Sequence, residues 1–298
     1  MRLGCHLSIA GGLHRAFEQA RKLEINAMQI FSHNARSWKF SPLTDEEVER
    51  FRQAWAESPV EYVVIHTSYL INLASPKRNV YYGSINALRK EIERAGQLGI
   101  SHVNTHVGAH LGRGVEEGLR RIVRALDAAL ESPEAERFPE VLILLENDAG
   151  TGTSLGARFE ELGFILDNGR HSERLRICFD TCHGFAAGYD FRTPEGLEGM
   201  LEEMDRAFGL ERLVLVHAND SKHPLGSRKD RHEHIGRGHI GLEGFRWVVN
   251  HPKLRDLPFI LETPKADEES EKLDSEMDRV NLATIRRLRK REAGDLNP

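Results

Sequence analysis

The sequence lacks any apolar run long enough to span a membrane, and it has few cysteines and no excess of basic residues. The 298-residue chain contains three cysteines, Cys5, Cys178 and Cys182, which cannot all pair. This scarcity favours a reducing environment and buried, unreactive thiols. The first residues read as a strand and not as a signal peptide. We therefore expect a cytoplasmic protein with no membrane partner.

The formal net charge of −5 argues against a surface coated with basic residues. It does not exclude a nucleic acid partner, because local patches and bound metals matter more than the sum. Three divalent cations would add six positive charges and take −5 to +1. Net charge therefore leaves the partner open. A hydrophobic content of 40% and a charged content of 29% describe a globular protein with an ample core.

Short apolar runs that read as strands alternate with amphipathic stretches that read as helices. This alternation predicts a parallel sheet, and eight repeats favour an α/β fold closed into a (β/α)8 TIM barrel over an open sheet. We expect a single catalytic domain over residues 1–290 and a frayed tail over 291–298. The expected strands cover residues 2–7, 27–31, 62–66, 102–106, 141–146, 175–180, 212–217 and 258–262.

Six of these strands end on a residue that can hold a metal ion. In a (β/α)8 barrel all strand C-termini open onto one face, so ligands scattered along the chain would meet there. His183 follows one strand end closely, and Asp230 and His232 would point the same way in an extended segment. The candidate metal ligands are His66, His106, Glu146, Asp180, His183, His217, Asp230, His232 and Glu262.

The candidate ligand set contains five histidines and four carboxylates. It is too large for one tetrahedral ion and too rich in nitrogen for magnesium or calcium. Imidazole combined with carboxylate favours zinc, with manganese or iron as alternatives, so the sequence predicts a site for two or three ions. Such sites commonly serve phosphodiester hydrolysis. The spacing alone also allows a metal-dependent sugar isomerase or epimerase on the same barrel.

Several motifs occur in order along nearly the whole chain: HLSIAGG from His6, HTSYLIN from His66, DTCH from Asp180, NDSK from Asn219, GSRKDRH from Gly226 and LETP from Leu261. Together they resemble the motifs of the endonuclease IV family. The members of this family are zinc-dependent endonucleases that act on abasic sites in DNA. Departures from the family pattern, such as Val107 and Asp148, remove no ligand; they put secondary activities in doubt before the main one.

The resemblance implies a site for three zinc ions, with manganese or iron possible at some positions, in which Glu146 and Glu262 are catalytic. Glu146 would bridge two ions, and this pair would activate the attacking water. The third ion would help to bind the phosphate and stabilise the leaving 3′ oxygen. The implied ligand sets are His66, His106 and Glu146; Glu146, Asp180, His217 and Glu262; and His183, Asp230 and His232.

The family cuts the backbone 5′ to the missing base, which leaves a 3′ hydroxyl and a 5′ deoxyribose phosphate, and it trims blocked 3′ ends. The implied partner is therefore double-stranded DNA, bound by a monomer. A nucleotide without a base stacks poorly and is easily flipped, which supplies part of the selectivity. Arg36 matches the inserting arginine of the family, Tyr69 and Leu70 match its wedge, and Arg231 could contact a phosphate.

Two alternatives remain open at this point. A sugar isomerase or epimerase would need a smaller metal site and would have no use for Arg36, Tyr69, Leu70 or the segment 230–232. A non-catalytic protein that binds damaged DNA would need an eroded ligand set, which the sequence does not show. The glycine-rich segment 236–241 suggests a phosphate-binding loop, but it lacks the strand-to-helix context and is expected to form a turn.

Overall fold

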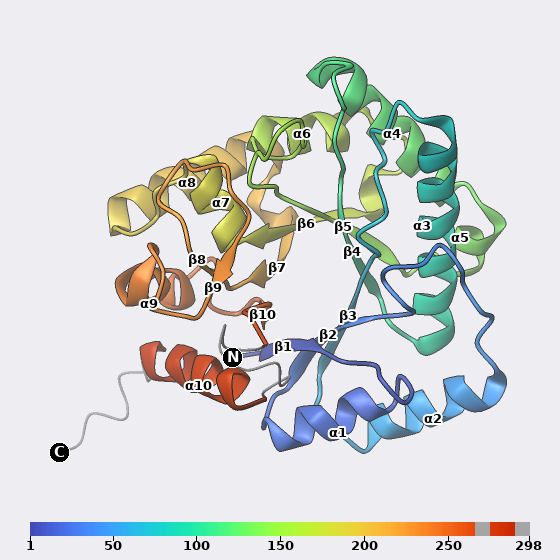
Figure 1. The fold of residues 1–298 in the computed structure, drawn as a ribbon, viewed down its shortest axis with the longest axis horizontal. Helices are drawn as coiled ribbons and strands as arrows, with labels where there is room; N and C mark the ends of the chain where they lie inside the picture. The colour runs from blue at the N-terminus through green and yellow to red at the C-terminus, as the bar shows by residue number, and fades with distance from the viewer. Residues whose placement is uncertain (266–274, 290–298) are drawn as a thin grey trace.

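The computed structural model describes residues 1–265 and 275–289 of the chain. Eight parallel strands form a closed barrel in the order β1-β10-β7-β6-β5-β4-β3-β2 (Figure 1), which confirms the predicted TIM barrel. The predicted tail at 291–298 lies outside the described residues. The barrel strands are β1 (Leu3–Leu7), β2 (Ala27–Phe31), β3 (Tyr62–His66), β4 (His102–His106), β5 (Leu142–Glu146), β6 (Leu175–Asp180), β7 (Leu213–His217) and β10 (Phe259–Leu261).

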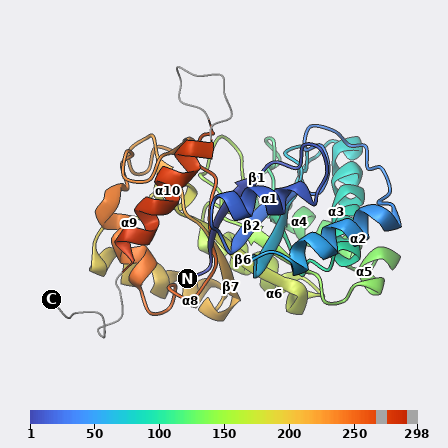
Figure 2. The same ribbon diagram turned by 90° about the horizontal axis from the view of Figure 1, so that it is seen from below.

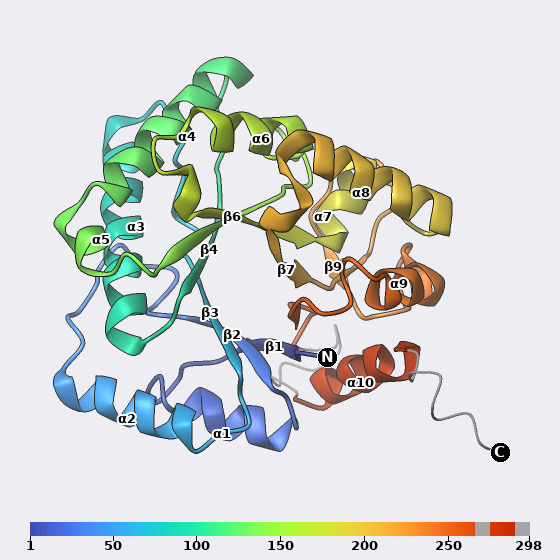
Figure 3. The same ribbon diagram turned by 180° about the vertical axis from the view of Figure 1, so that it is seen from behind.

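Helices surround the barrel, as the view from behind also shows (Figure 3). The last described helix, α10, lies next to α9 and closes the ring beside the first strand (Figure 2). No described helix is both long and apolar enough to cross a membrane. The helices are α1 (Arg15–Lys22), α2 (Asp45–Ala56), α3 (Arg78–Leu98), α4 (Val115–Leu130), α5 (Pro133–Arg137), α6 (Phe159–Asn168), α7 (Thr181–Ala187), α8 (Pro194–Phe208), α9 (Gly241–Asn250) and α10 (Ser275–Leu288).

Every predicted strand is present, and its ends differ from the prediction by at most one residue. Helix α3 is followed by Gly99, which has a φ of +81°, the left-handed conformation that suits glycine at the end of a helix. Two elements near the barrel mouth were not predicted. The short helix α7 begins directly after β6, and a small antiparallel hairpin joins β8 (Asp220–Ser221) to β9 (His232–Glu233).

The barrel interior is a packed core of side chains from several strands, which is separate from the larger core between strands and helices. Residues two apart on a strand point to the same side of the sheet. The residue two positions after an inward-facing residue therefore also faces the barrel interior. Two residues beyond Val64, Leu144, Cys178, Leu215 and Ile260 stand five of the candidate ligands: His66, Glu146, Asp180, His217 and Glu262. The apolar side chains thus fill the barrel interior directly beneath the polar side chains at its mouth.

Candidate metal centre

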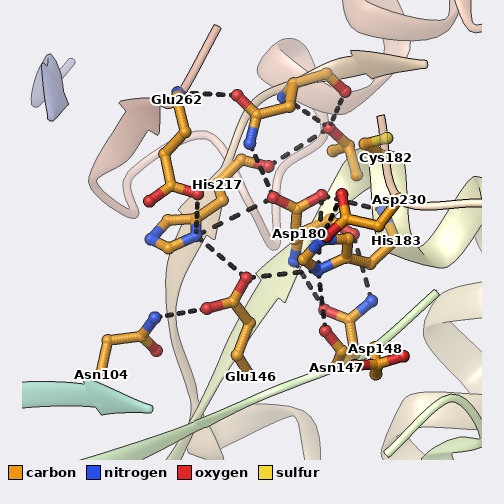
Figure 4. A network of polar contacts seen from close by, with 12 residues as sticks. Asn104, Glu146, Asn147, Asp148, Asp180, Cys182, His183, His217, Asp230 and Glu262 are labelled. Atoms are coloured by element: carbon orange, nitrogen blue, oxygen red, sulfur yellow. Dashed lines mark hydrogen bonds and ion pairs between the residues drawn. The ribbon is translucent and has the colours of Figure 1, made fainter. Parts of the chain in front are cut away.

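All nine predicted ligand side chains lie at the C-terminal mouth of the barrel. Figure 4 shows six of them: Glu146, Asp180, His183, His217, Asp230 and Glu262. Six are at strand ends or directly after them, His183 comes from α7, and Asp230 and His232 come from the loop and hairpin after β7. Several of these side chains line a cavity of about 260 Å³, which we call the mouth pocket. Its walls also include His6, Phe31, Tyr69, Thr263 and Lys265.

The donor atoms form three groups, and within each group all of them lie within 4.8 Å of one another. Glu146 belongs to two groups, so it connects them. These groups coincide with the three sets that the family resemblance implies. The groups are His66, His106 and Glu146; Glu146, Asp180, His217 and Glu262; and His183, Asp230 and His232.

Two cysteines lie close enough to join the donor groups. Cys178 is near Glu146 and His217, and Cys182 is near Asp180 and His232. Burial raises the pKa of both thiols to about 12, which disfavours the thiolate form that binds metals. The expectation that the cysteines are buried is confirmed, because all three are free and buried.

The two oxygens of Glu146 face different groups. Oε2 lies 3.3 Å from Nε2 of His66, and Oε1 lies 3.3 Å from Nδ1 of His217. In the third group, Nε2 of His183 lies 3.2 Å from Oδ1 of Asp230. The Glu146 carboxylate is fully buried, so it reaches the neighbouring groups without contacting solvent.

Four of the five histidines share one arrangement, in which one ring nitrogen faces an oxygen and the other faces carboxylates. Because these oxygens accept hydrogen bonds, the facing nitrogen carries a proton, and the other nitrogen is the one that would bind a metal ion. Metal-binding histidines usually have this kind of partner. The acceptors are Thr67 O for His66 (2.8 Å), Asn147 O for His183 (3.0 Å), Gln29 Oε1 for His217 (2.9 Å) and Glu262 O for His232 (3.0 Å).

Two buried ring nitrogens have no hydrogen-bond partner among the described residues: Nδ1 of His106 and Nε2 of His232. Leaving a buried polar atom unpaired costs about 1–3 kcal/mol unless another group takes its lone pair. Nε2 of His232 lies 3.5 Å from Oδ1 of Asp230 and 3.6 Å from Oδ2 of Asp180, beyond hydrogen-bond range. The residues present therefore fit divalent cations, and imidazole with carboxylate fits zinc best.

Carboxylates and imidazoles in the site shift each other's pKa values. Burial alone would raise the pKa of Glu146, but the imidazoles of His106 and His217 outweigh it and lower the pKa well below its ordinary range. Burial would lower the pKa of His183, but Asp180 and Asp230 raise it well above its ordinary value. Without metal ions, protons on the imidazoles thus compensate the negative charge of the carboxylates. A divalent cation would take over this role and release those protons.

Sequence analysis missed the buried amides that orient the candidate ligands. Asn104 donates to Oε2 of Glu146 at 2.5 Å (Figure 4). Asn219 donates to Oδ2 of Asp180 at 2.6 Å. Gln29 donates to Oε1 of Glu262. Strand alternation could have identified Gln29, because it is a polar residue at an inward position of the otherwise apolar strand β2. Asn104 lies on β4, where four of the five residues are polar, so it does not stand out in the same way.

The glycine-rich segment 236–241 does surround an anion, but that anion is the carboxylate of Asp220. Backbone N–H groups of Gly236, Gly238 and Ile240 donate to it at 2.9, 3.1 and 2.9 Å. A Cβ atom at Gly238 would lie 2.5 Å from Oδ1 of Asp220, so the close approach requires glycine there. The expected turn is confirmed, and it supports the hairpin that carries His232.

The predicted DNA-contacting residues lie on exposed loops around the mouth. Tyr69 is 67% exposed, and its ring packs edge-on against Phe31 with 5.3 Å between centroids. Leu70 is half-buried and Arg36 is exposed. Arg231 is exposed and lines a second cavity of about 470 Å³. Asp148 lines that cavity too, and its Oδ1 accepts from Gly150 N at 2.8 Å, within its own loop.

Comparisons with known proteins agree with this geometry. Residues 17–282 match the family described as "Xylose isomerase-like TIM barrel". The chain is 45% identical over 287 residues to "Probable endonuclease 4" of Trichlorobacter lovleyi, covering 96% of this chain and 99% of the relative. It is 46% identical over 287 residues to the protein of the same name from Chloroflexus aurantiacus, covering 96% and 98% of the two chains.

Solved structures also resemble this chain over nearly its whole length. Endonuclease IV from Thermus thermophilus matches with a TM-score of 0.82 and 40% identity, covering 96% of this chain and 100% of that one. A D-tagatose 3-epimerase-like protein matches with a TM-score of 0.69 at 23% identity, covering 96% and 99% of the two chains, which shows a shared fold alone. On the strength of these nearly full-length matches, the chain belongs to the endonuclease IV family of the xylose isomerase-like TIM barrels.

Proposed function

We propose that this chain is a metal-dependent phosphodiesterase that incises double-stranded DNA on the 5′ side of abasic sites. The products would be a 3′ hydroxyl and a 5′ deoxyribose phosphate, and the same centre would trim blocked 3′ ends. The observation that carries this proposal is the meeting of three donor groups around Glu146, beside an exposed aromatic side chain on the rim, Tyr69. The names and titles of the relatives support the general class of activity.

The proposed cofactor is zinc, with three ions per chain and with manganese or iron able to replace it at some positions. Divalent ions held by these groups would lower the pKa of a water molecule and neutralise charge on a phosphodiester. The ligands would be His66, His106, Glu146, Asp180, His183, His217, Asp230, His232 and Glu262.

The two carboxylates that we propose as catalytic have different surroundings. Glu146 is fully buried and faces two donor groups, which suits a bridging role beneath the reacting atoms. Glu262 lines the mouth pocket, so it is the carboxylate that a bound phosphate and the attacking water would meet. Its Oε2 lies 3.2 Å from Nδ1 of His217, and Gln29 holds its other oxygen, so the side chain has one fixed orientation.

The side chains around the mouth pocket would recognise the missing base. An abasic nucleotide flips out of the duplex at low cost, and wedge side chains in the minor groove would hold the resulting kink. Tyr69, Leu70 and Arg36 are available for this role, because they project from the loops next to the mouth pocket. Arg231, in the segment between β8 and β9, is free of salt bridges among the described residues and would bind a backbone phosphate. Its Nη1 donates to Asp230 O at 2.6 Å.

A sugar isomerase or epimerase is the second candidate. Its support is limited to the shared barrel, because the epimerase structures are too distant to carry more than the fold. A small sugar site would not explain the third donor group or the exposed Tyr69. An endonuclease function therefore explains more of the observed side chains than a sugar isomerase or epimerase function does.

A single assay separates the candidates. A labelled duplex with one tetrahydrofuran abasic analogue is incubated with the protein before and after chelation of its metals. Incision next to the analogue that chelation abolishes and zinc restores supports the endonuclease. Binding without incision would indicate a damage-binding protein, and a lack of any effect on the duplex would favour the sugar enzyme.

A further inference from the structure

The loop that carries Arg36 is fastened to helix α3 at both of its ends. Arg94 of α3 donates from Nη2 to the carbonyl of Ser32 at 2.5 Å, and from Nη1 to the carbonyl of Ser41 at 2.7 Å. One guanidinium thus joins the start and the end of the segment 32–41. Arg94 is itself only 8% exposed, so water competes little for these hydrogen bonds.

A buried carboxylate, Glu91, completes this attachment. Its Oε2 accepts a hydrogen bond from the hydroxyl of Ser32 at 2.5 Å, and that hydroxyl accepts from Nε of Arg94 at 3.1 Å. Nδ1 of His33 lies 3.2 Å from Oε1 of Glu91, in the geometry of an ion pair and not of a hydrogen bond. Glu91 is fully buried, and its partners, Ser32 and His33, are not candidate metal ligands.

His33 fills the inside of the loop. Its Nε2 lies 3.2 Å from the carbonyl of Ser37, and its ring packs on Phe40 with 3.8 Å between centroids. At the tip, Asn34 accepts from the backbone N–H of Arg36 at 3.0 Å. The loop therefore has a defined shape from its base to the residue that we propose to enter the DNA.

A separate hydrogen bond ties this loop to the one that carries Tyr69. The hydroxyl of Ser68, directly before Tyr69, donates to the carbonyl of Ala35, directly before Arg36, at 2.6 Å. The two proposed DNA-contacting residues are thus held together by the residues that precede them. Any change that moves segment 32–41 would move Arg36 relative to Tyr69.

We propose that Glu91 is a positioning residue for lesion recognition, because with Arg94 it presets the segment 32–41 so that Arg36 stands beside Tyr69 before DNA arrives. The inference rests on the proposed function for its consequence in catalysis. A wedge that is already in shape avoids the entropy cost of ordering a loop on binding. Loss of the Glu91 charge weakens the hydrogen bond from the Ser32 hydroxyl, through which Glu91 is joined to the buried Arg94, so the loop should open.

Trypsin tests the loop without DNA or activity, because Arg36 and Lys39 are exposed cleavage sites within it. We expect Glu91→Gln, and separately the milder Ser32→Ala, to raise the rate of cleavage at these two sites about tenfold or more. The matched control is Arg174→Gln. Arg174 likewise clamps backbone carbonyls, those of Ala135 and Phe138, but on a segment away from the mouth. Wild-type cleavage rates at Arg36 and Lys39 in both Glu91→Gln and Ser32→Ala would overturn the inference.

Kinetics on two substrates test the consequence for recognition. For Glu91→Gln we expect kcat/KM on the abasic duplex to fall about tenfold more than on bis-p-nitrophenyl phosphate, chiefly through KM. In an Arg36→Ala background this extra loss should disappear, because both changes act through the same side chain. An equal loss on both substrates, or full additivity, would refute the positioning role. Failure of the wild type to incise the duplex would instead refute the proposed function, while the trypsin result would still decide whether Glu91 sets the loop.

Discussion

The side-chain oxygen of Gln29 lies 2.9 Å from Nε2 of His217, although 188 residues separate them in sequence. The amide nitrogen of Gln29 donates to Glu262 and lies 3.0 Å from Nδ1 of His6. One buried amide on β2 therefore orients two proposed ligands on β7 and after β10. Its position two residues beyond Ala27 explains how it reaches them, since both side chains point into the barrel.

Replacing Gln29 by leucine should weaken zinc binding, because His217 and Glu262 both lose their orienting partner. Loss of such a partner typically costs about 10- to 100-fold in metal affinity. Zinc titration against a competing chelator measures the effect. Gln53→Leu is the matched control, since Gln53 also contacts a glutamate, Glu57, but on the exposed face of α2. Unchanged zinc affinity in Gln29→Leu would show that the amide does not support the site.

Glu146→Gln should lower turnover on abasic duplex by orders of magnitude while the protein still folds. The change removes one negative charge from the carboxylate that two donor groups share, and it preserves the shape of the side chain. Incision kinetics and a thermal unfolding curve measure the two effects separately. The exposed Glu160 of α6 provides the control, as Glu160→Gln. Near-normal turnover in Glu146→Gln would remove Glu146 from the mechanism.

Tyr69→Ala should weaken binding to abasic duplex more than binding to undamaged duplex. Loss of an aromatic ring that stacks on a nucleic acid costs about 1–3 kcal/mol. Dissociation constants from fluorescence anisotropy on both duplexes, in the Glu146→Gln background to prevent incision, give the difference. Tyr82, a second exposed tyrosine on α3, supplies the control variant Tyr82→Ala. An equal loss on the two duplexes would assign Tyr69 a structural role.

A prediction about acid stability concerns His102, at the other end of β4. Burial, with Arg176 and Arg2 nearby, lowers the pKa of His102 from 6.5 to about 4. Above pH 6.5 the residue is neutral in both states and contributes nothing. Between pH 6.5 and 4 the unfolded chain takes up the proton first, so folding stability falls. His102→Gln should remove that loss.

Urea unfolding at pH 7 and pH 5, on metal-depleted protein, measures the contribution of His102. We expect the free energy of unfolding to fall less with acid in His102→Gln than in the wild type, by an amount on the order of 1 kcal/mol. Metal depletion removes the acid dependence that bound ions would add. His239→Gln, at an exposed histidine, serves as the control. An identical fall in His102→Gln and wild type would contradict the expected sign.

The sequence alone was sufficient for the barrel, and the nine proposed ligand residues meet at its mouth as expected, because both follow from local patterns. Short apolar runs define the strands, and the last residue of each run is visible as His66, Glu146 or Asp180. The parallel topology then brings these ends together without further information. The motifs that resemble endonuclease IV added the grouping into three sets, which the geometry of the donor atoms reproduces.

The supporting contacts were not predictable, because they join residues far apart in the chain. Strand alternation places Gln29 at an inward position, but only the closed barrel shows which proposed ligands Gln29, Asn104 and Asn219 contact. The segment 236–241 was correctly expected to turn, but its partner Asp220 precedes it by about 20 residues. Nothing in the sequence marks Glu91 as a positioning residue, because it is one of many charged residues on a long helix.

The most direct test of the account is the metal content of fully active protein. Elemental analysis by mass spectrometry, on protein whose incision of abasic duplex has been titrated to one active site per chain, counts the ions. We expect three zinc ions per chain, lost together with activity on chelation and regained together with zinc. Full activity in protein that holds no ion or a single ion would contradict the central claim.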